Sequence, residues 1–110
     1  MSCDWVLYLD DLIASAEKIE RYLRNVKADS FTTNEVLFDA VLFNIQVIGE
    51  AVKQLPADVR AGAPDVEWQK IAGLRDILIH AYFGVDLDIV WDVVVSKLPD
   101  LERRVGALLE

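Results

Sequence analysis

A chain of 110 residues is long enough for one compact domain and too short for two of ordinary size, so we expect a single domain over residues 1–110. Its formal net charge of −8 argues against tight, indiscriminate binding of nucleic acid, because such binding depends on neutralising phosphates with lysine and arginine. Its longest stretch without a charged residue, Ala40 to Gly49, has ten residues, whereas a membrane-spanning helix needs about 20 apolar ones.

Composition and the N-terminal sequence also bear on assembly and location. Hydrophobic residues make up 54% of the chain, a high share for so small a protein, and the surplus apolar surface suggests a subunit interface. The N-terminal sequence MSCDWVLYLDD carries acids where a secretory signal carries basic residues, so we expect a cytoplasmic protein without membrane contact. Cys3 is the single cysteine, which excludes an internal disulfide and a cysteine-based zinc cage.

The first expected helix spans Trp5 to Val26. Its apolar residues recur every three or four positions and mark one buried stripe: Leu9, Leu12, Ile13, Ala16, Ile19, Leu23 and Val26. On the opposite face two acids each precede a base by four positions, Glu17 with Arg21 and Glu20 with Arg24. This order favours exposed ion pairs on a helix, so we expect that face to be solvated.

Residues 27–33 are polar, and Thr32 followed three positions later by Glu35 is typical of a capping box that opens a second helix, running to about Leu55. The sequence VLFDAVLFNIQVIGEAV is apolar on most sides, which predicts burial against several elements or against a second subunit. Gly49 within it costs about 1 kcal/mol relative to alanine. Either another helix crosses closely at Gly49, or the glycine is simply tolerated.

The clearest break in the chain runs from Pro56 to Asp65, which we expect to form a loop with room for one helical turn. A third helix is expected to start near Glu67, and a fourth to follow Asp86. Pro99 is expected to kink the fourth helix or to open a last segment. The stretch VWDVVV is β-prone, but its flanks fit a helix better. The chain therefore predicts an all-α, up-and-down bundle of four to five helices.

The stretch GLRDILIHAYFGVD, residues 73–86, offers the richest chemistry. Arg75 presents a planar fork of donors to a phosphate, and His80, the single histidine, can move a proton near neutral pH. On an ideal helix these two side chains project roughly 140° apart. Either two chains meet across this region, or the helix breaks at His80. Asp76 would share a face with His80, where its carboxylate would hold one imidazole nitrogen and favour the protonated ring.

Simpler interpretations stay open for several residues. Arg75 would also pair with a nearby acid such as Glu50, and Tyr82 would pack at a helix end. The three tryptophans, Trp5, Trp68 and Trp91, are interpreted as core or interface residues rather than as platforms for stacking bases. Any contact with RNA must be local, and the basic residues that could supply it are Lys53, Arg60, Lys70 and Arg75.

With Tyr82 the motif becomes R-x4-H-x-Y, which resembles the signature of the HEPN superfamily. The flanking WQKIAGLRDILIHAYFGVDLDIVWDVV and the upstream NIQVIGEAVKQLP are similar to the HepT toxins of prokaryotic MNT–HEPN toxin–antitoxin systems. The resemblance implies a HEPN-type bundle that dimerises, with Arg75 and His80 as catalytic residues in a composite cleft. Asp76 is then a supporting residue, at a position where many members carry asparagine.

The resemblance further implies a homodimeric, metal-independent endoribonuclease without a cofactor. Its RNA substrate would be cut by attack of a 2′-hydroxyl on the adjacent phosphorus, leaving a 2′,3′-cyclic phosphate. The family also has a cognate MNT-type nucleotidyltransferase antitoxin that transfers AMP from ATP to a tyrosine of the toxin, and Tyr82 matches that tyrosine. A second interpretation stays open, in which the dimer cleaves nothing and serves as a nucleotide-binding or regulatory partner of a nucleotidyltransferase.

Overall fold

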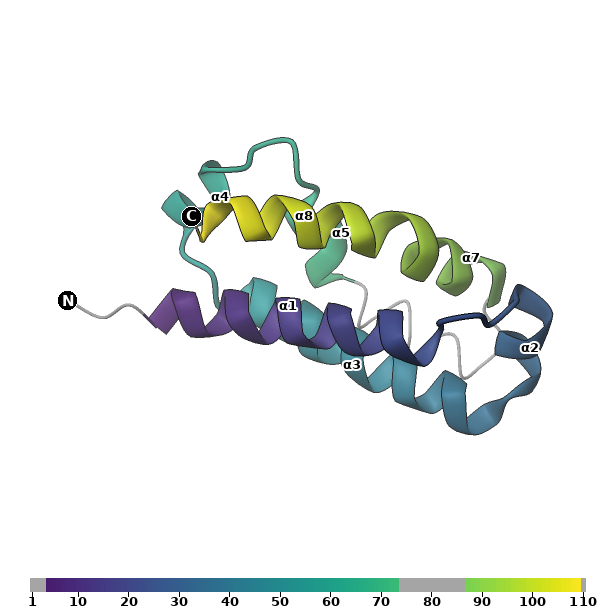
Figure 1. Cartoon of the computed structure of the whole chain (residues 1–110). Helices are drawn as coiled ribbons and strands as arrows, with labels where there is room; N and C mark the ends of the chain where they lie inside the picture. Colours follow the sequence, from purple (N-terminus) through teal and green to yellow (C-terminus); the bar gives the residue numbers. More distant parts are fainter. Residues whose placement is uncertain (1–3, 74–86, 110) are drawn as a thin grey trace.

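A computed structural model describes residues 4–73 and 87–109. Figure 1 shows the longer helical elements packed side by side: α1 (Asp4–Tyr22), α3 (Glu35–Lys53) and the continuous run of α7 (Leu87–Asp92), η1 (Val93–Lys97) and α8 (Leu98–Leu108). The shorter helices are α2 (Ala28–Thr33), α4 (Ala57–Ala61) and α5 (Trp68–Ala72). No strand occurs within these two described ranges, and the predicted all-α bundle is confirmed.

The long helices differ in direction. Helix α3 returns beside α1 in the opposite direction, and the α7–η1–α8 run packs on α1 and is directed like α3 (Figure 1). Helix α5 packs on α3. None of the described helices is both long and apolar enough to cross a lipid bilayer.

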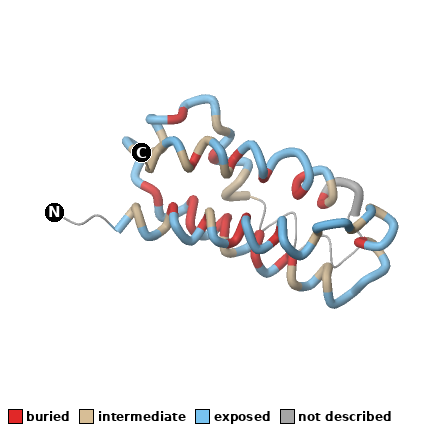
Figure 2. The backbone as a smooth tube through the Cα atoms, in the orientation of Figure 1, coloured by how far each residue is buried: buried red, intermediate tan, exposed pale blue. Residues whose placement is uncertain are grey.

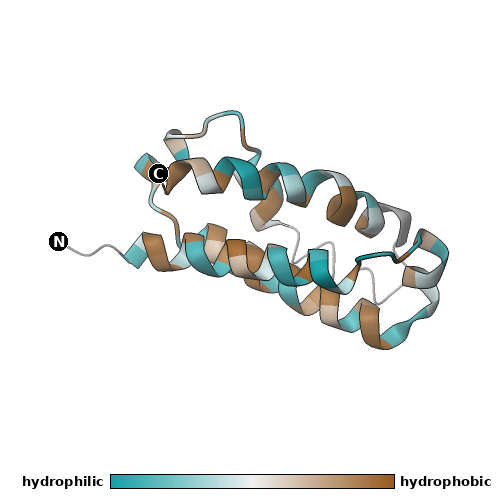
Figure 3. Cartoon of the chain, viewed as in Figure 1, coloured by the Kyte–Doolittle hydropathy of each residue, from teal (hydrophilic) through white to brown (hydrophobic). Residues whose placement is uncertain are grey.

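The core lies where α1, α3 and the last helical run face one another. Buried segments line the inner sides of these helices in Figure 2, and Figure 3 shows hydrophobic and hydrophilic segments alternating along them. The fully or almost fully buried residues include Leu9, Leu12, Ala16, Ile19, Val41, Leu42, Ile45, Ile48, Val52, Leu98, Leu101 and Val105. Burial of one such aliphatic side chain contributes about 1.5–3 kcal/mol. The stripe predicted for the first helix is confirmed, since its remaining members pack partly buried against this core.

Helix α1 ends at Tyr22, four residues before the expected end. Asn25 lies in a turn that the N–H of Val26 closes by donating to the oxygen of Leu23, and its φ of 64° is in the left-handed region that asparagine tolerates better than most residues. Residues 28–33, expected as a connection, then form α2, because Phe31 is fully buried and anchors the turn. Its ring lies 5.3 Å from that of Trp91, centroid to centroid, and joins α2 to α7.

The predicted capping box of the second long helix is wrong. The Thr32 hydroxyl donates to the backbone oxygen of Asp29 inside α2, so it does not cap the helix that follows. Asn34 caps α3 instead, and its side-chain oxygen accepts from the backbone N–H of Leu37 at 3.0 Å. Threonine and asparagine both cap helices well. Because Thr32 belongs to α2, Asn34 is the residue that precedes α3 and caps it.

The last helical run changes its hydrogen-bond pattern ahead of Pro99. Residues 93–97 form a π-helix, and the N–H of Leu98 donates to the oxygen of Val93, five positions back. Proline has no N–H, and its ring crowds the carbonyl four positions earlier, here that of Val95. The wider turn accommodates this crowding. The predicted disturbance at Pro99 is thus found, α8 ends at Leu108, and VWDVVV is helical as expected.

The charged face of α1 differs from the prediction. Among the described residues the ion pairs lie elsewhere, so the two expected pairs within α1 do not form. Glu20 instead shares a hydrogen bond with Glu102 of α8. Partial burial, then this bond and the charges of Glu20 and Glu17, raise the pKa of Glu102 to about 7. The Glu102 carboxyl therefore retains its proton well above pH 4.5.

We expect the free energy of unfolding to fall as the pH rises from about 4.5 to about 7. Between these values the folded chain binds a proton on Glu102 that the unfolded chain has lost, so the stabilisation is present below pH 4.5 and lost above pH 7. Glu102→Gln keeps a donor toward Glu20 at every pH. The variant should exceed wild type by about 1 kcal/mol at pH 8, after allowance for solvent screening, and match it at pH 4.5.

Urea unfolding followed by circular dichroism at both pH values measures this difference. Asp11→Asn on the exposed surface of α1 removes the same charge and serves as the control. An equal gain in both variants would attribute the effect to net charge and contradict the role of Glu102.

Candidate active site

Residues 74–86 lie outside the described part of the chain, and they include every residue on which we expect the chemistry: Arg75, Asp76, His80 and Tyr82. Their roles and mutual distances therefore stay predictions. The structure does describe α5, which ends three residues before Arg75, and α7, which begins at Leu87. The contacts of α5 show how the fold holds the chain immediately ahead of the motif.

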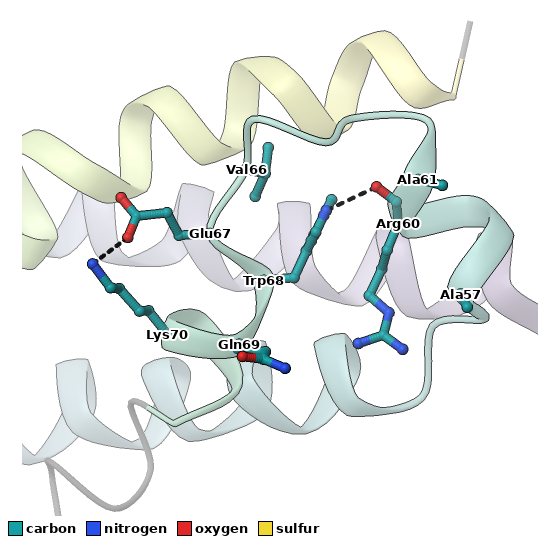
Figure 4. A pocket seen from close by; sticks show the side chains of 8 residues that line it. All are labelled: Ala57, Arg60, Ala61, Val66, Glu67, Trp68, Gln69 and Lys70. Carbon is teal, nitrogen blue, oxygen red and sulfur yellow. Dashed lines mark hydrogen bonds and ion pairs between the residues drawn. The ribbon is translucent and has the colours of Figure 1, made fainter.

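Trp68 fixes the start of α5. Its indole N–H donates to the backbone oxygens of Arg60 at 3.0 Å and of Ala63 at 3.1 Å, which ties α5 to α4 and the loop behind it (Figure 4). The side chain is 7% exposed, and a buried indole N–H left without an acceptor would be costly. Trp5 and Trp91 are partly buried against the core. The interpretation of all three tryptophans as packing residues is confirmed.

The other end of α5 packs closely on α3 at Gly49, which is buried. A Cβ at this position would lie 3.4 Å from the backbone oxygen of Ile71 and 3.6 Å from that of Ala72. The expected close crossing of another helix is therefore present. One methyl group would still find ordinary van der Waals contact, so this crossing admits alanine as well as glycine and excludes only larger side chains.

Substitutions of Gly49 should test this limit on side-chain size. Gly49→Ala is expected to be neutral or to stabilise by up to about 1 kcal/mol, because alanine favours helices and its methyl group fits. Gly49→Leu is expected to destabilise by about 1–3 kcal/mol, because the larger side chain must displace the last carbonyls of α5. Urea unfolding of both variants checks this, and equal stabilities would show that α5 does not hold its place against α3.

Glu50, the next residue on α3, is exposed. It forms no ion pair with another residue of the described ranges, in keeping with a solvated side chain. A contact between Glu50 and Arg75 is not tested.

Two of the basic residues considered for RNA contact line one cavity between α4 and α5. This cavity has a volume of about 480 Å³ and is lined by Ala57, Arg60, Ala61, Val66, Glu67, Trp68, Gln69 and Lys70 (Figure 4). Lys53 does not contribute to it. A second cavity of about 540 Å³ lies between α5 and the η1–α8 segment and shares Val66, Glu67 and Lys70.

The charges around the first cavity are unequally paired. Lys70 lies 2.5 Å from Glu67, and their hydrogen bond and mutual attraction lower the pKa of Glu67 and raise that of Lys70. Arg60 has no ion-pair partner among the described residues, and its Nε is buried without a hydrogen-bond acceptor. Within the described ranges no three His, Cys, Asp or Glu side chains gather as metal ligands would.

An all-helical bundle that carries R-x4-H-x-Y directly after α5 is a protein of the HEPN class. Residues 12–108 match the model of the family described as Ribonuclease HepT-like. The chain belongs to this family, as the resemblance predicted.

Three relatives illustrate the similarity. The chain is 40% identical over its 110 residues to a Methanocaldococcus jannaschii protein named "Gamma-glutamylcyclotransferase and putative RNase", and it spans half the length of that protein. It is 36% identical over 103 residues to a "Putative RNase" of Caldanaerobacter subterraneus, covering 94% of this chain and 92% of the relative. It is 37% identical over 97 residues to a "Probable ribonuclease HepT" of Thermococcus cleftensis, covering 88% of each. No solved structure gives a significant match.

Sequence reasoning did not find the cavity beside α5. It named Arg60 and Lys70 among the residues of a possible basic cluster for RNA, but it did not predict a cavity that both residues line. It also placed Trp68 in the core without identifying its hydrogen bonds. Neither feature has a sequence signal, because each depends on how the loop after α4 folds back.

Proposed function

We propose that this protein is a metal-independent endoribonuclease and the toxin of a type II toxin–antitoxin system, acting in the cytoplasm. One observation carries the proposal: nearly the whole chain matches the Ribonuclease HepT-like family, and Arg75 and His80 stand in the R-x4-H spacing. The names of the relatives from Caldanaerobacter and Thermococcus support the same activity.

The proposed reaction needs one proton acceptor, one proton donor and one cation. His80 takes the proton of a 2′-hydroxyl, whose oxygen attacks the adjacent phosphorus. The bond to the 5′-oxygen breaks, and that oxygen takes a proton from an acid, for which His80 of a second subunit is suited. The products are a 2′,3′-cyclic phosphate and a 5′-hydroxyl. Arg75 stabilises the added negative charge of the transition state, and Asp76 holds the imidazole.

Cleavage of RNA in the presence of EDTA tests this proposal. Unmodified wild-type protein should cut and leave 2′,3′-cyclic phosphate ends, and His80→Ala should lose at least about 10²-fold in rate, the usual contribution of a general acid or base. Tyr82→Phe, two positions away, is the matched control and should retain cleavage. Circular dichroism must show that both variants fold.

A second candidate function is favoured by the net charge of −8, which opposes RNA binding. In that case the protein is a non-catalytic, nucleotide-binding or regulatory partner of a nucleotidyltransferase. Absence of cleavage by folded, unmodified wild-type protein across several classes of RNA would favour it over the ribonuclease.

The proposal includes a cognate MNT-type nucleotidyltransferase as antitoxin. This partner would transfer AMP from ATP to the hydroxyl of Tyr82 and release pyrophosphate. Because Tyr82 is two residues from His80, the added nucleotide would bring bulk and a negative phosphate to the RNA site. Modified protein would then be unable to bind its substrate.

The proposal also includes a homodimer, for which α3 offers an exposed apolar face. Val36 is 80% exposed and Phe43, seven positions later on the same side of the helix, is 64% exposed. Ala40 and Val47 continue this stripe and are partly exposed. An apolar stripe on one face of a helix is typical of a surface that meets another protein. A second copy of α3 would cover it and bring two copies of the motif into one assembly.

Phe43→Glu should convert the dimer to a monomer and reduce cleavage, because a charge would be buried at the interface. Analytical ultracentrifugation measures the oligomeric state, with an expected loss of dimer affinity of about tenfold or more. Leu7→Glu on α1, where Leu7 is 63% exposed, is the matched control and should stay dimeric. A Phe43→Glu protein that remains a dimer would exclude this face, and a fully active monomer would exclude the composite cleft.

A further inference from the structure

We propose that the cavity between α4 and α5, lined by Arg60, Gln69 and Lys70, binds a phosphate of the RNA strand other than the one at the cleaved bond. The inference rests on the proposed ribonuclease function and deepens it. It assigns substrate binding to residues outside the R-x4-H-x-Y motif.

Arg60 is the reason for choosing this cavity. Its Nε is buried without a hydrogen-bond acceptor, and no described carboxylate lies within ion-pair distance of its guanidinium. A guanidinium held partly out of water without an acceptor is costly, and its donors form a planar fork that matches the oxygens of a phosphate. A phosphate in the cavity would therefore compensate the positive charge of this guanidinium.

The surrounding charges favour an anion at this place despite the acidic chain. Glu67, the one acid that lines the cavity, is paired with Lys70 at 2.5 Å. Asp65, the acid next to it in the loop, is paired with Arg104. These pairs leave the positive charge of Arg60 uncompensated among the described residues. A local positive site is what a protein of net charge −8 needs in order to hold RNA.

The shape of the cavity favours a strand over a small enclosed ligand. The cavity is open to solvent, and in Figure 4 the side chains of Arg60, from α4, and Gln69, from α5, both border it. Trp68 forms a fixed wall, because its indole N–H already bonds to two backbone oxygens. A buried ring of this kind does not stack on a base, so we expect the contact to be with the backbone and independent of base sequence.

Binding of RNA that resists cleavage tests the inference apart from the chemistry. The probe is a fluorescent, fully 2′-O-methylated single-stranded oligoribonucleotide, and its anisotropy is measured with unmodified full-length protein at several salt concentrations. Arg60→Gln should weaken binding about tenfold and reduce the slope of log K against log salt by about 0.7, the loss of one phosphate contact. Arg60→Lys should keep the slope but bind more weakly, because lysine has no fork.

Arg24→Gln is the matched control. Arg24 is exposed in the turn after α1, at the opposite end of the bundle from α4 (Figure 1), and its replacement removes the same charge. It should leave both the affinity and the slope at their wild-type values. An equal effect of Arg24→Gln and Arg60→Gln would overturn the inference in favour of general electrostatics.

Each of the remaining outcomes also tests the proposed phosphate site. If Arg60→Gln folds and binds with wild-type affinity, this inference fails, while loss of cleavage in His80→Ala would still uphold the ribonuclease. If Arg60→Gln does not fold, unchanged affinity in Arg60→Lys overturns the inference. If Arg60→Gln loses binding of free AMP but keeps binding of the oligonucleotide, the cavity is a nucleotide site and the inference fails. Wild-type protein that binds no RNA contradicts the proposed function itself.

Discussion

The position of α5 is the constraint on which the rest of the site depends. This helix has five residues, too few to be stable alone, so it relies on tertiary contacts at both ends. At its start the indole of Trp68 bonds to the oxygens of Arg60 and Ala63, and at its end the last carbonyls lie against Gly49 of α3. Trp68 also forms one wall of the cavity between α4 and α5, and the contact at Gly49 sets the position of the last residues of α5.

The net charge of the chain does not describe the charge around each site. A chain of net charge −8 spreads its acids over the surface, and two of them, Glu20 and Glu102, meet directly between α1 and α8. That pair is tolerated because Glu102 retains a proton, which makes the packing of α8 sensitive to pH near neutrality. Around α5, by contrast, acids are paired with Lys70 and Arg104, and the charge of Arg60 stays uncompensated among the described residues. Packing of α8 on α1 places two acids side by side, whereas the acids near α5 have a basic side chain within ion-pair distance.

The family match and the structure support different parts of the proposed function. Membership in the Ribonuclease HepT-like family supports the reaction and the catalytic motif. The described helices add a cavity beside α5 and an exposed apolar stripe on α3. Both support the proposal of a small ribonuclease whose binding of RNA depends on residues outside the motif and on a second subunit.

Most helices of the bundle could be predicted from local sequence patterns. The stripe of α1, the helix from Glu35, the break after Pro56 and the start of α5 near Glu67 follow from periodicity and from proline and glycine, which act within a few residues. The R-x4-H-x-Y motif was equally visible, since its spacing is a property of the sequence. Local signals failed where two choices were nearly equal, as with Thr32 and Asn34 at the cap of α3.

Tertiary structure alone decided the features that join distant residues. The sequence determined that Trp68 would be buried, but only the fold shows that its N–H reaches Arg60 and Ala63. The sequence determined that Glu20 would lie on an exposed face of α1, but only the packing of α8 brings Glu102 to it. The physical reason is the same in both cases: helix periodicity specifies which side of a helix is apolar, whereas the partner of a polar group depends on how whole elements dock.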